Sequence, residues 1–229
     1  MSQQAIVLKL FEFAILIFAL SVHEAAHAWT ASRLGDPTAR MLGRMTLNPI
    51  KHIDPFGSIL VPLAMLFLFP AGFLIGWAKP TPVTPRNFKN LRRDDILTTI
   101  AGPVSNFLSA IVATIFLILL AKLSPQGGQM VLELIRGNVG TSAVAAIGLF
   151  LYLTIWLNII LAVFNLIPLP PLDGSHVLRH FLPYEALRMY DRIGLIGLVL
   201  FLFLGGRILD MFVGPLLGYV NFVLLRVTL

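Results

Sequence analysis

Five long apolar stretches, separated by short polar segments, set the pattern of hydrophobic and polar positions along the chain. They are roughly Ala5 to Ala31, Phe56 to Trp77, Ile96 to Ala121, Thr141 to Ile167 and Ile193 to Val223. Each meets or exceeds the about 20 residues that an α-helix needs to cross a bilayer. The pattern predicts an all-α polytopic membrane protein with about four to six membrane-embedded segments.

The second stretch, Phe56 to Trp77, differs from the others because it contains Pro62, Pro70 and Gly72. Proline inside a helix removes a backbone hydrogen bond and clashes with the preceding turn. Irregular backbone at membrane depth is tolerated where protein buries it or where it lines a wet cavity. We therefore expect this stretch to be re-entrant, entering and leaving on one side of the membrane.

Two loops beside the predicted membrane helices carry turn and strand signals. The loop from Ser32 to Asp54 has turn residues around a short extended piece, Arg40 to Leu47. The segment Gly76 to Pro85 contains three prolines, which favour an extended backbone over a helix. We expect short extended strands here, with an edge exposed near the functional site.

Composition supports a single domain embedded in the membrane. Hydrophobic residues make up 57% of the chain and charged residues only 12%, whereas a soluble domain averages about 25% charged residues. No repeat or long polar linker interrupts residues 1–229, so a single domain is expected. Its apolar residues 193–225 are expected to form a hairpin. The first stretch is expected to be retained, because no basic run precedes it as in a secretory signal.

Charge and cysteine content argue against a nucleic-acid-binding surface and against a metal site with cysteine ligands. Most of the seventeen Lys and Arg residues lie in short loops between apolar stretches, where signals for membrane orientation are found. The net charge of +6 therefore does not indicate a nucleic-acid partner, since no basic patch is interleaved with aromatic residues. Because the chain has no cysteine, a metal ion would have to be held by His and carboxylate side chains.

The first chemical motif is His23-Glu24-Ala25-Ala26-His27, at the end of the first apolar stretch. On a helix, histidines four residues apart project from one face at a spacing that suits one zinc ion. A glutamate beside the first ligand can accept a proton from metal-bound water. The alternative is a polar cluster that ties helices together, but ionisable groups within the membrane favour a functional site.

A catalytic zinc site of this kind needs a third protein ligand from elsewhere in the chain. Asp173 is favoured because it follows Asn165-Leu-Ile-Pro-Leu-Pro-Pro-Leu at the end of an apolar stretch, where three prolines force a rigid, unwound backbone. Asp36 and Asp54, each followed by proline, are expected to have turn or helix-cap roles. The remaining contenders are His52, His176 and His180. Because Val177 stands where a general base would be needed, we expect the last two at the membrane interface.

Three motifs in order resemble the site-2 protease family of intramembrane metalloproteases. They are His23-Glu-Ala-Ala-His27, Ala101-Gly-Pro103-Val-Ser-Asn106, and Asn165-x-x-Pro-x-Pro-x-Leu-Asp173-Gly174. The resemblance implies that His23, His27 and Asp173 bind Zn²⁺ and that Glu24 is the catalytic acid and base. The chain resembles the compact branch without a PDZ or CBS domain, with Phe56 to Trp77 as an addition to the smallest core.

Asn106 and Asn165 have two possible roles in such a protein. Their amides have the chemistry to orient the substrate or stabilise the oxyanion of the reaction. Alternatively, each is a buried amide that ties helices together.

The resemblance implies an intramembrane zinc metalloprotease, which hydrolyses peptide bonds in or near transmembrane segments of membrane-protein substrates in regulated intramembrane proteolysis. A helix hides its carbonyls in internal hydrogen bonds, so the substrate has to unwind locally. The extended pieces near Arg40 to Leu47 and Gly76 to Val83 could pair with it by strand addition. The rival hypotheses are a transporter, which usually shows internal repeats that are missing here, and a zinc-binding scaffold without activity.

The distribution of basic residues predicts the orientation. With the site assembled on one face and the final stretch as a hairpin, thirteen of the seventeen basic residues, Arg226 among them, lie on the side of the site. Lys9, Lys122, Arg136 and Arg207 lie on the other side. Since basic loops stay in the cytoplasm, we expect the site to face the cytoplasm of the cell membrane and the N-terminus to lie outside.

Overall fold

The computed structural model describes residues 3–68 and 76–229, which are helical with no β-strand. The elements are α1 (Gln3–Leu34), α2 (Thr38–Met41), the 3₁₀ turn η1 (Pro49–Lys51), the π-helical η2 (Pro55–Leu60), α3 (Val61–Leu68), the 3₁₀ turn η3 (Pro85–Asn87), α4 (Leu91–Leu123), α5 (Gly127–Ile135), α6 (Ala143–Asn165), α7 (Asp173–Arg179), α8 (Tyr184–Leu204) and α9 (Gly206–Thr228). Four segments of the described chain are long and apolar enough to cross a membrane: Ile6–Leu34, Leu91–Leu123, Ala143–Asn165 and Gly206–Thr228. The prediction of an all-α polytopic membrane protein is confirmed.

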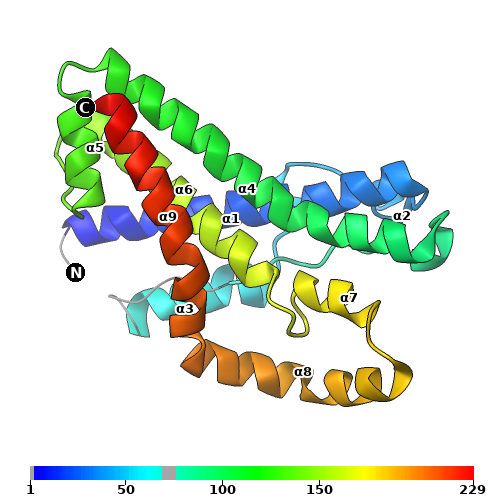
Figure 1. The fold of residues 1–229 in the computed structure, drawn as a ribbon. Helices are drawn as coiled ribbons and strands as arrows, with labels where there is room; N and C mark the ends of the chain where they lie inside the picture. The colour runs from blue at the N-terminus through cyan, green and yellow to red at the C-terminus, as the bar shows by residue number, and fades with distance from the viewer. Residues whose placement is uncertain (1–2, 69–75) are drawn as a thin grey trace.

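Helix α4 is the centre of the bundle and packs on both α1 and α6 (Figure 1). Its buried side chains are mostly small and follow one face: Gly102, Asn106, Ala110, Ala113, Leu117 and Ala121. Without a large hydrophobic driving force in lipid, small residues stabilise helix pairs by allowing close approach of the backbones. This face therefore brings α1 and α6 close to α4.

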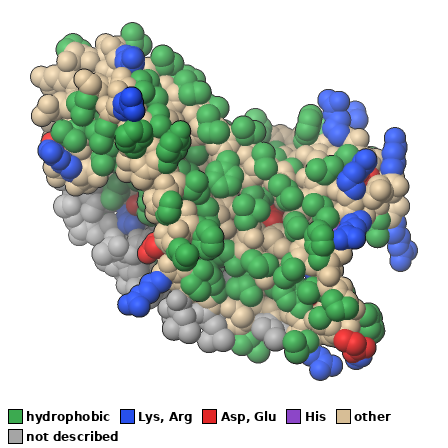
Figure 2. Space-filling view, viewed as in Figure 1, with side chains coloured by type: hydrophobic (Ala, Val, Ile, Leu, Met, Phe, Trp, Pro, Cys, Tyr) green, Lys and Arg blue, Asp and Glu red, His purple; other side chains and the backbone are tan. Residues whose placement is uncertain are grey.

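The helix termini gather at two opposite ends of the bundle. The C-terminal end of α1, the N-terminal end of α4 and α7 lie at one end, whereas α5 and the C-terminus lie at the other (Figure 1). Figure 2 shows apolar side chains across the middle of the visible face, with Lys and Arg side chains towards its edges. This distribution agrees with a bundle whose middle lies in a bilayer.

The two ends of the stretch Phe56 to Trp77 meet. The backbone N–H of Trp77 donates to the carbonyl of Gly57 at 3.1 Å, and the hydroxyl of Ser58 donates to the carbonyl of Trp77 at 2.8 Å. The stretch therefore leaves where it enters, as expected of a re-entrant segment. Pro70 and Gly72, which supported this prediction, lie outside the described residues.

The extended piece predicted from Arg40 to Leu47 is wrong at its start, because Arg40 and Met41 belong to α2. The helix ends in a turn at Gly43 (φ 67°), where the backbone N–H of Arg44 donates to the carbonyl of Ala39 at 2.8 Å. A positive φ is accessible to glycine at little cost. Residues 76–84 are non-helical, as predicted from their prolines, and form no strand.

The C-terminal residues do not form the expected hairpin. Helices α8 and α9 meet at Gly205, and α9 then runs to α5 at the end of the bundle away from α7 (Figure 1). The carbonyl of Thr228 is 2.5 Å from the position that a Cβ atom of Gly128 would occupy. Arg226 therefore lies at the opposite end from α7, because glycine in α5 lets the end of α9 pack closely there.

Candidate active site

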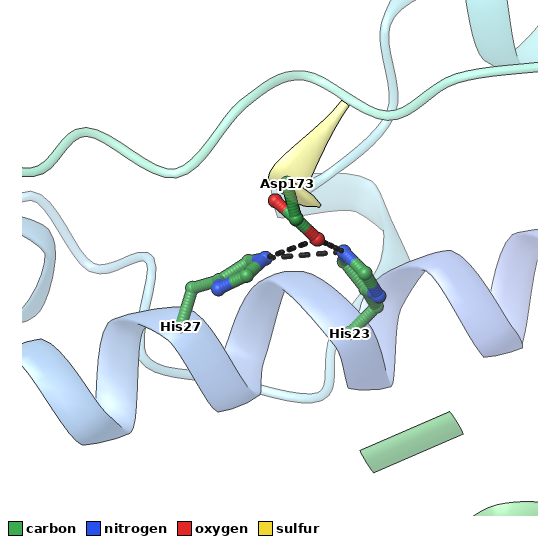
Figure 3. A group of neighbouring side chains, drawn as sticks. All are labelled: His23, His27 and Asp173. Atoms are coloured by element: carbon green, nitrogen blue, oxygen red, sulfur yellow. Dashed lines mark hydrogen bonds and ion pairs between the residues drawn. The ribbon is translucent and has the colours of Figure 1, made fainter. Parts of the chain in front are cut away.

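Three side chains from two distant parts of the chain converge at the α7 end of the bundle (Figure 3). His23 and His27 project from one face of α1, and Asp173 is the first residue of α7. His23 Nε2 and His27 Nε2 are 3.1 Å apart, and Asp173 Oδ2 is 3.1 Å from the first and 3.5 Å from the second. The three atoms thus form a nearly equilateral triangle.

The other ring nitrogen of each histidine faces an acceptor on α4. His23 Nδ1 lies 2.6 Å from Asn106 Oδ1, and His27 Nδ1 lies 2.7 Å from the carbonyl oxygen of Thr98. Since both partners accept, each Nδ1 carries a hydrogen and donates it. In a neutral imidazole the second nitrogen is then a free acceptor, so both Nε2 atoms present lone pairs to Asp173.

Three acceptors without a proton between them repel one another unless a cation lies among them. A tetrahedral zinc ion with bonds of about 2.0–2.1 Å keeps its ligand atoms about 3.3 Å apart, which agrees with the sides of this triangle. Asp173 Oδ2 is buried and has no hydrogen-bond partner in the described part of the chain. The donor set therefore fits a zinc ion. Histidines that bind a metal typically donate the N–H of their other ring nitrogen to an oxygen acceptor, as the two Nδ1 atoms do here.

Gly102 provides the space beside the triangle. A Cβ atom at this position would lie 2.5 Å from His27 Nε2 and 2.6 Å from His23 Nε2. Any side chain on α4 at residue 102 would therefore push against both histidines. The glycine of the Gly-Pro-x-x-Asn motif keeps this space open.

The loop after α6 determines the position of Asp173. A Cβ atom on Gly174 would lie 2.2 Å from the carbonyl oxygen of Leu166, so the chain packs on the end of α6 only with glycine there. The hydroxyl of Tyr190 donates to the carbonyl of Pro168 at 2.9 Å. The loop thus places the carboxylate of Asp173 beside the two histidines.

Glu24 is held by the non-helical segment 76–84. The backbone N–H of Thr81 donates to Glu24 Oε2 at 2.6 Å, and the hydroxyl of Thr81 donates to the main-chain carbonyl of Glu24 at 2.9 Å. The described residues provide no hydrogen-bond partner for Oε1. One carboxylate oxygen is fixed and the other is available for proton transfer.

The two asparagines lie in different environments. Asn106 is fully buried, and besides facing His23 it donates from Nδ2 to Asn158 Oδ1 at 2.9 Å. This geometry fits the second of its two expected roles, a buried amide between helices. Asn165 is partly exposed at the end of α6, and its Nδ2 donates to the carbonyl of Leu161 at 3.0 Å.

The other acidic contenders accept hydrogen bonds away from the triangle. Asp54 caps η2 by accepting the backbone N–H groups of Phe56 and Gly57 at 3.0 and 2.7 Å. Asp36 accepts the backbone N–H of Thr84 at 2.7 Å. Burial would raise the pKa of Asp36, but hydrogen bonds from Thr38, Thr84 and Asn87 lower it below its ordinary value. This carboxylate therefore joins the two loops rather than binding the metal.

The three remaining histidines lie outside the triangle. His52 is buried, and its Nε2 donates to the carbonyl of Thr46 at 2.8 Å. His180 Nε2 lies 2.7 Å from Asp95 Oδ2, which joins α7 to α4, and His176 is exposed. None of them belongs to the group of side chains that could hold a metal ion among the described residues.

Sequence reasoning missed the roles of Gly102, Asn158 and Thr81. Gly102 stood in a quoted motif, but its effect depends on the side chains that face it. Asn158 carried a signal, since it is a polar residue inside the apolar stretch Thr141 to Ile167. For Thr81 the chain offered no signal, because its partner Glu24 is far away in sequence.

Comparison with known proteins agrees with this geometry. The family model for peptidase family M50 matches residues 11–204. The chain is 39% identical over 213 residues to "Putative zinc metalloprotease YwhC" of Bacillus subtilis (strain 168), with 92% of this chain and 84% of that protein covered. It is 28% identical over 178 residues to "Putative zinc metalloprotease Rip2" of Mycolicibacterium smegmatis, with 75% of this chain and 57% of that protein covered.

Rip2 of Mycobacterium tuberculosis (strain H37Rv) is 31% identical over 172 residues, and again 57% of its length is covered. The chain thus spans less than two thirds of the two mycobacterial relatives. No solved structure gives a significant match. The family model and the Bacillus relative cover most of the chain, and therefore it belongs to peptidase family M50, the site-2 protease family, and is a membrane-embedded zinc metalloprotease.

Proposed function

We propose that this chain hydrolyses peptide bonds in or near transmembrane segments of membrane-protein substrates, as in regulated intramembrane proteolysis. The observation that carries the proposal is the triangle of three proton-free acceptors with Glu24 beside it, on a helix long and apolar enough to cross a membrane. A site within such a helix can be reached by a substrate segment that is itself in the membrane. This separates the proposal from hydrolysis of soluble peptides.

Each site residue has a distinct role in the proposal. His23, His27 and Asp173 hold the zinc ion, which when bound polarises the substrate carbonyl and lowers the pKa of water to about 7. Glu24 takes a proton from the attacking water at Oε1 and passes it to the leaving nitrogen. Asn106 donates nothing to the substrate in this scheme, because its amide is already bonded to His23 and Asn158.

The segment 76–84 is the proposed edge for an unwound substrate. The backbone N–H groups of Trp77, Lys79 and Thr81 point alternately inward, to Gly57 O, His52 O and Glu24 Oε2. In an extended chain the residues between them face the other way. Ala78 is buried and the carbonyl of Pro80 accepts from Arg44, so Pro82 offers a carbonyl but no N–H, and a substrate strand would donate to this edge.

We propose that the site faces the cytoplasm of the cell membrane. Without Arg226, which lies beside α5, twelve of the seventeen basic residues lie on the side of the site. This excess still has the sign expected of a cytoplasmic face. Single cysteines at Ser32 and Thr84 should react with an impermeant thiol reagent from the cytoplasmic face only. Labelling of either of them from outside would contradict this orientation.

The decisive experiment for the function is cleavage of single-pass test substrates by purified protein and by its Glu24→Gln variant. The amide keeps the shape of the side chain but cannot accept the proton. We expect about one zinc per chain in both proteins, with cleavage by the wild type alone. Turnover near the wild-type rate in Glu24→Gln would contradict the role of Glu24, and failure of the wild type to cleave any test substrate would favour a zinc-binding scaffold.

A further inference from the structure

Arg44 is a buried cation that the site described above does not use. Its side chain follows the turn at Gly43, and the residue is only 7% exposed. Its guanidinium donates to the carbonyl of Lys79 at 2.5 Å and to that of Pro80 at 3.4 Å. Among the described residues no carboxylate lies within salt-bridge distance of it. Burial of a charge without an ion pair is costly, so the two carbonyl contacts require an explanation.

The carbonyl of Pro80 and the N–H of Thr81 belong to one peptide group, which is planar and rigid. One side of this group therefore faces Arg44 and the other side donates to Glu24 Oε2 at 2.6 Å. Pro80 and Pro82 have no N–H, so Thr81 is the only backbone donor between Lys79 and Val83. Their rings also restrict the φ angles on both sides of Thr81.

A second contact fixes the same segment from behind. The backbone N–H of Lys79 donates to the carbonyl of His52 at 2.8 Å, while the carbonyl of Lys79 accepts from Arg44. Residue 79 is thus bound at both backbone groups, just before the peptide group that reaches Glu24. Loss of Arg44 would leave the contact of Lys79 with His52 and that of the Thr81 hydroxyl with Glu24, but it would free the carbonyls of Lys79 and Pro80 and allow their peptide groups to rotate.

We propose that Arg44 is a positioning residue for the catalytic base: through the peptide group of Pro80 and Thr81 it holds the carboxylate of Glu24 in place. The proposal rests on the proposed role of Glu24 in hydrolysis. Thr81 binds Oε2 and leaves Oε1 free to move the proton. Arg44 touches neither zinc ligands nor the reacting atoms, so its loss slows the chemical step without releasing the metal.

The test compares Arg44→Met with Arg40→Met, because Arg40 is an exposed arginine in α2, just before Arg44. On a single-pass test substrate we expect Arg44→Met to lower kcat by about tenfold to a hundredfold, with KM changed by less than about twofold and zinc content unchanged. Arg40→Met should match the wild type. Arg44→Lys, which keeps one donor for a carbonyl, should recover part of kcat. Wild-type kcat in Arg44→Met, or loss of zinc in parallel with kcat, overturns the proposal.

Thr81→Pro removes the N–H that reaches Glu24, and it gives a second route to the answer. Its kcat should fall by a similar factor, and adding Arg44→Met should lower it little further, because both substitutions act on one contact. If the two substitutions lower kcat by independent factors in the double variant, the proposal is overturned. If Arg44→Met does not fold, a wild-type kcat in Thr81→Pro also overturns the proposal.

Hydrogen exchange of the segment 76–84 tests the contact without any substrate. Exchange should be faster in zinc-loaded Arg44→Met than in the wild type, and unchanged in Arg40→Met. Equal exchange in all three proteins overturns the proposal. If the wild type cleaves no substrate, the proposed function fails, yet the exchange rates still decide whether Arg44 holds this segment.

Discussion

The two halves of the helix bundle bury their contacts in different ways. In the site half, next to α7, α1 meets α4 through polar groups: His23 faces Asn106, and His27 faces the carbonyl of Thr98. In the apolar half, next to α5, the buried cluster is made of side chains such as Leu117 and Ile155. The ion pair of Lys9 and Glu12, at 2.7 Å, is also buried on α1 in this half.

The two halves of the same helices therefore have different roles. Apolar contacts in a membrane depend on close fit, since lipid is as apolar as the side chains themselves. Hydrogen bonds at the site have direction and fix the ring of each histidine. Substitutions in the site half should therefore change zinc binding and activity, whereas those in the apolar half should change stability alone.

The largest expected effect comes from the double variant His23→Ala, His27→Ala. It removes two of the three zinc ligands, so zinc content should fall from about one per chain to near zero, and cleavage should disappear. Elemental analysis of the purified protein measures this directly. Full zinc occupancy in this variant would show that the metal is held elsewhere.

Gly102→Ala should have the next largest effect. Its Cβ atom would meet the Nε2 atoms of His23 and His27 at 2.5–2.6 Å, and both rings are held by their Nδ1 bonds. We expect zinc affinity to fall by about a hundredfold or more, measured by competition with a chelator. Gly148→Ala is the matched change in the apolar half, where the added atom meets Met130 Sδ at 2.8 Å. The flexible methionine can move, so zinc affinity should be unchanged there.

Asn106→Leu should weaken zinc binding by about tenfold to a hundredfold, because His23 Nδ1 loses its acceptor and the ring its fixed tautomer. Asn158→Leu should cost less, since Asn106 Nδ2 keeps the carbonyl of Ala19 at 3.4 Å as a partner. Chelator competition gives both affinities. Equal losses in the two variants would mean that the amides act by packing and not through His23.

Leu117→Ala should leave the site intact. Leu117 is fully buried in the apolar half, and its truncation should lower the free energy of unfolding by about 2 kcal/mol. We expect the low end of the usual range because the side chain unfolds into lipid rather than water. Thermal unfolding and zinc content, measured on one preparation, separate the two effects. A lower zinc affinity in this variant would break the division between the halves.

Much of the fold was visible in the sequence because it depends on local properties. Four of the five apolar stretches contain or overlap the segments able to span a membrane. The charged residues Arg92 to Asp95 obscured the true start of α4. Asn90 caps this helix by accepting the N–H of Arg93 at 3.1 Å, which allows polar residues to form its first turn.

The C-terminal region could not be predicted in the same way. The apolar residues 193–225 are compatible with a hairpin or with two helices that diverge, since hydrophobicity does not specify direction. Packing of α9 on α5 and α6 decides between them. Arg226 was assigned to the wrong end for this reason.

The sequence by itself determined that His23 and His27 share one face of a membrane helix, because their spacing and the apolar length around them are local properties. It also singled out Asp173 through the prolines before it. Only the tertiary structure decided that Gly102 leaves room beside the histidines, that Asn106 faces His23, and that Thr81 reaches Glu24. Each of these contacts joins residues far apart in the chain, and their directions depend on how the helices pack.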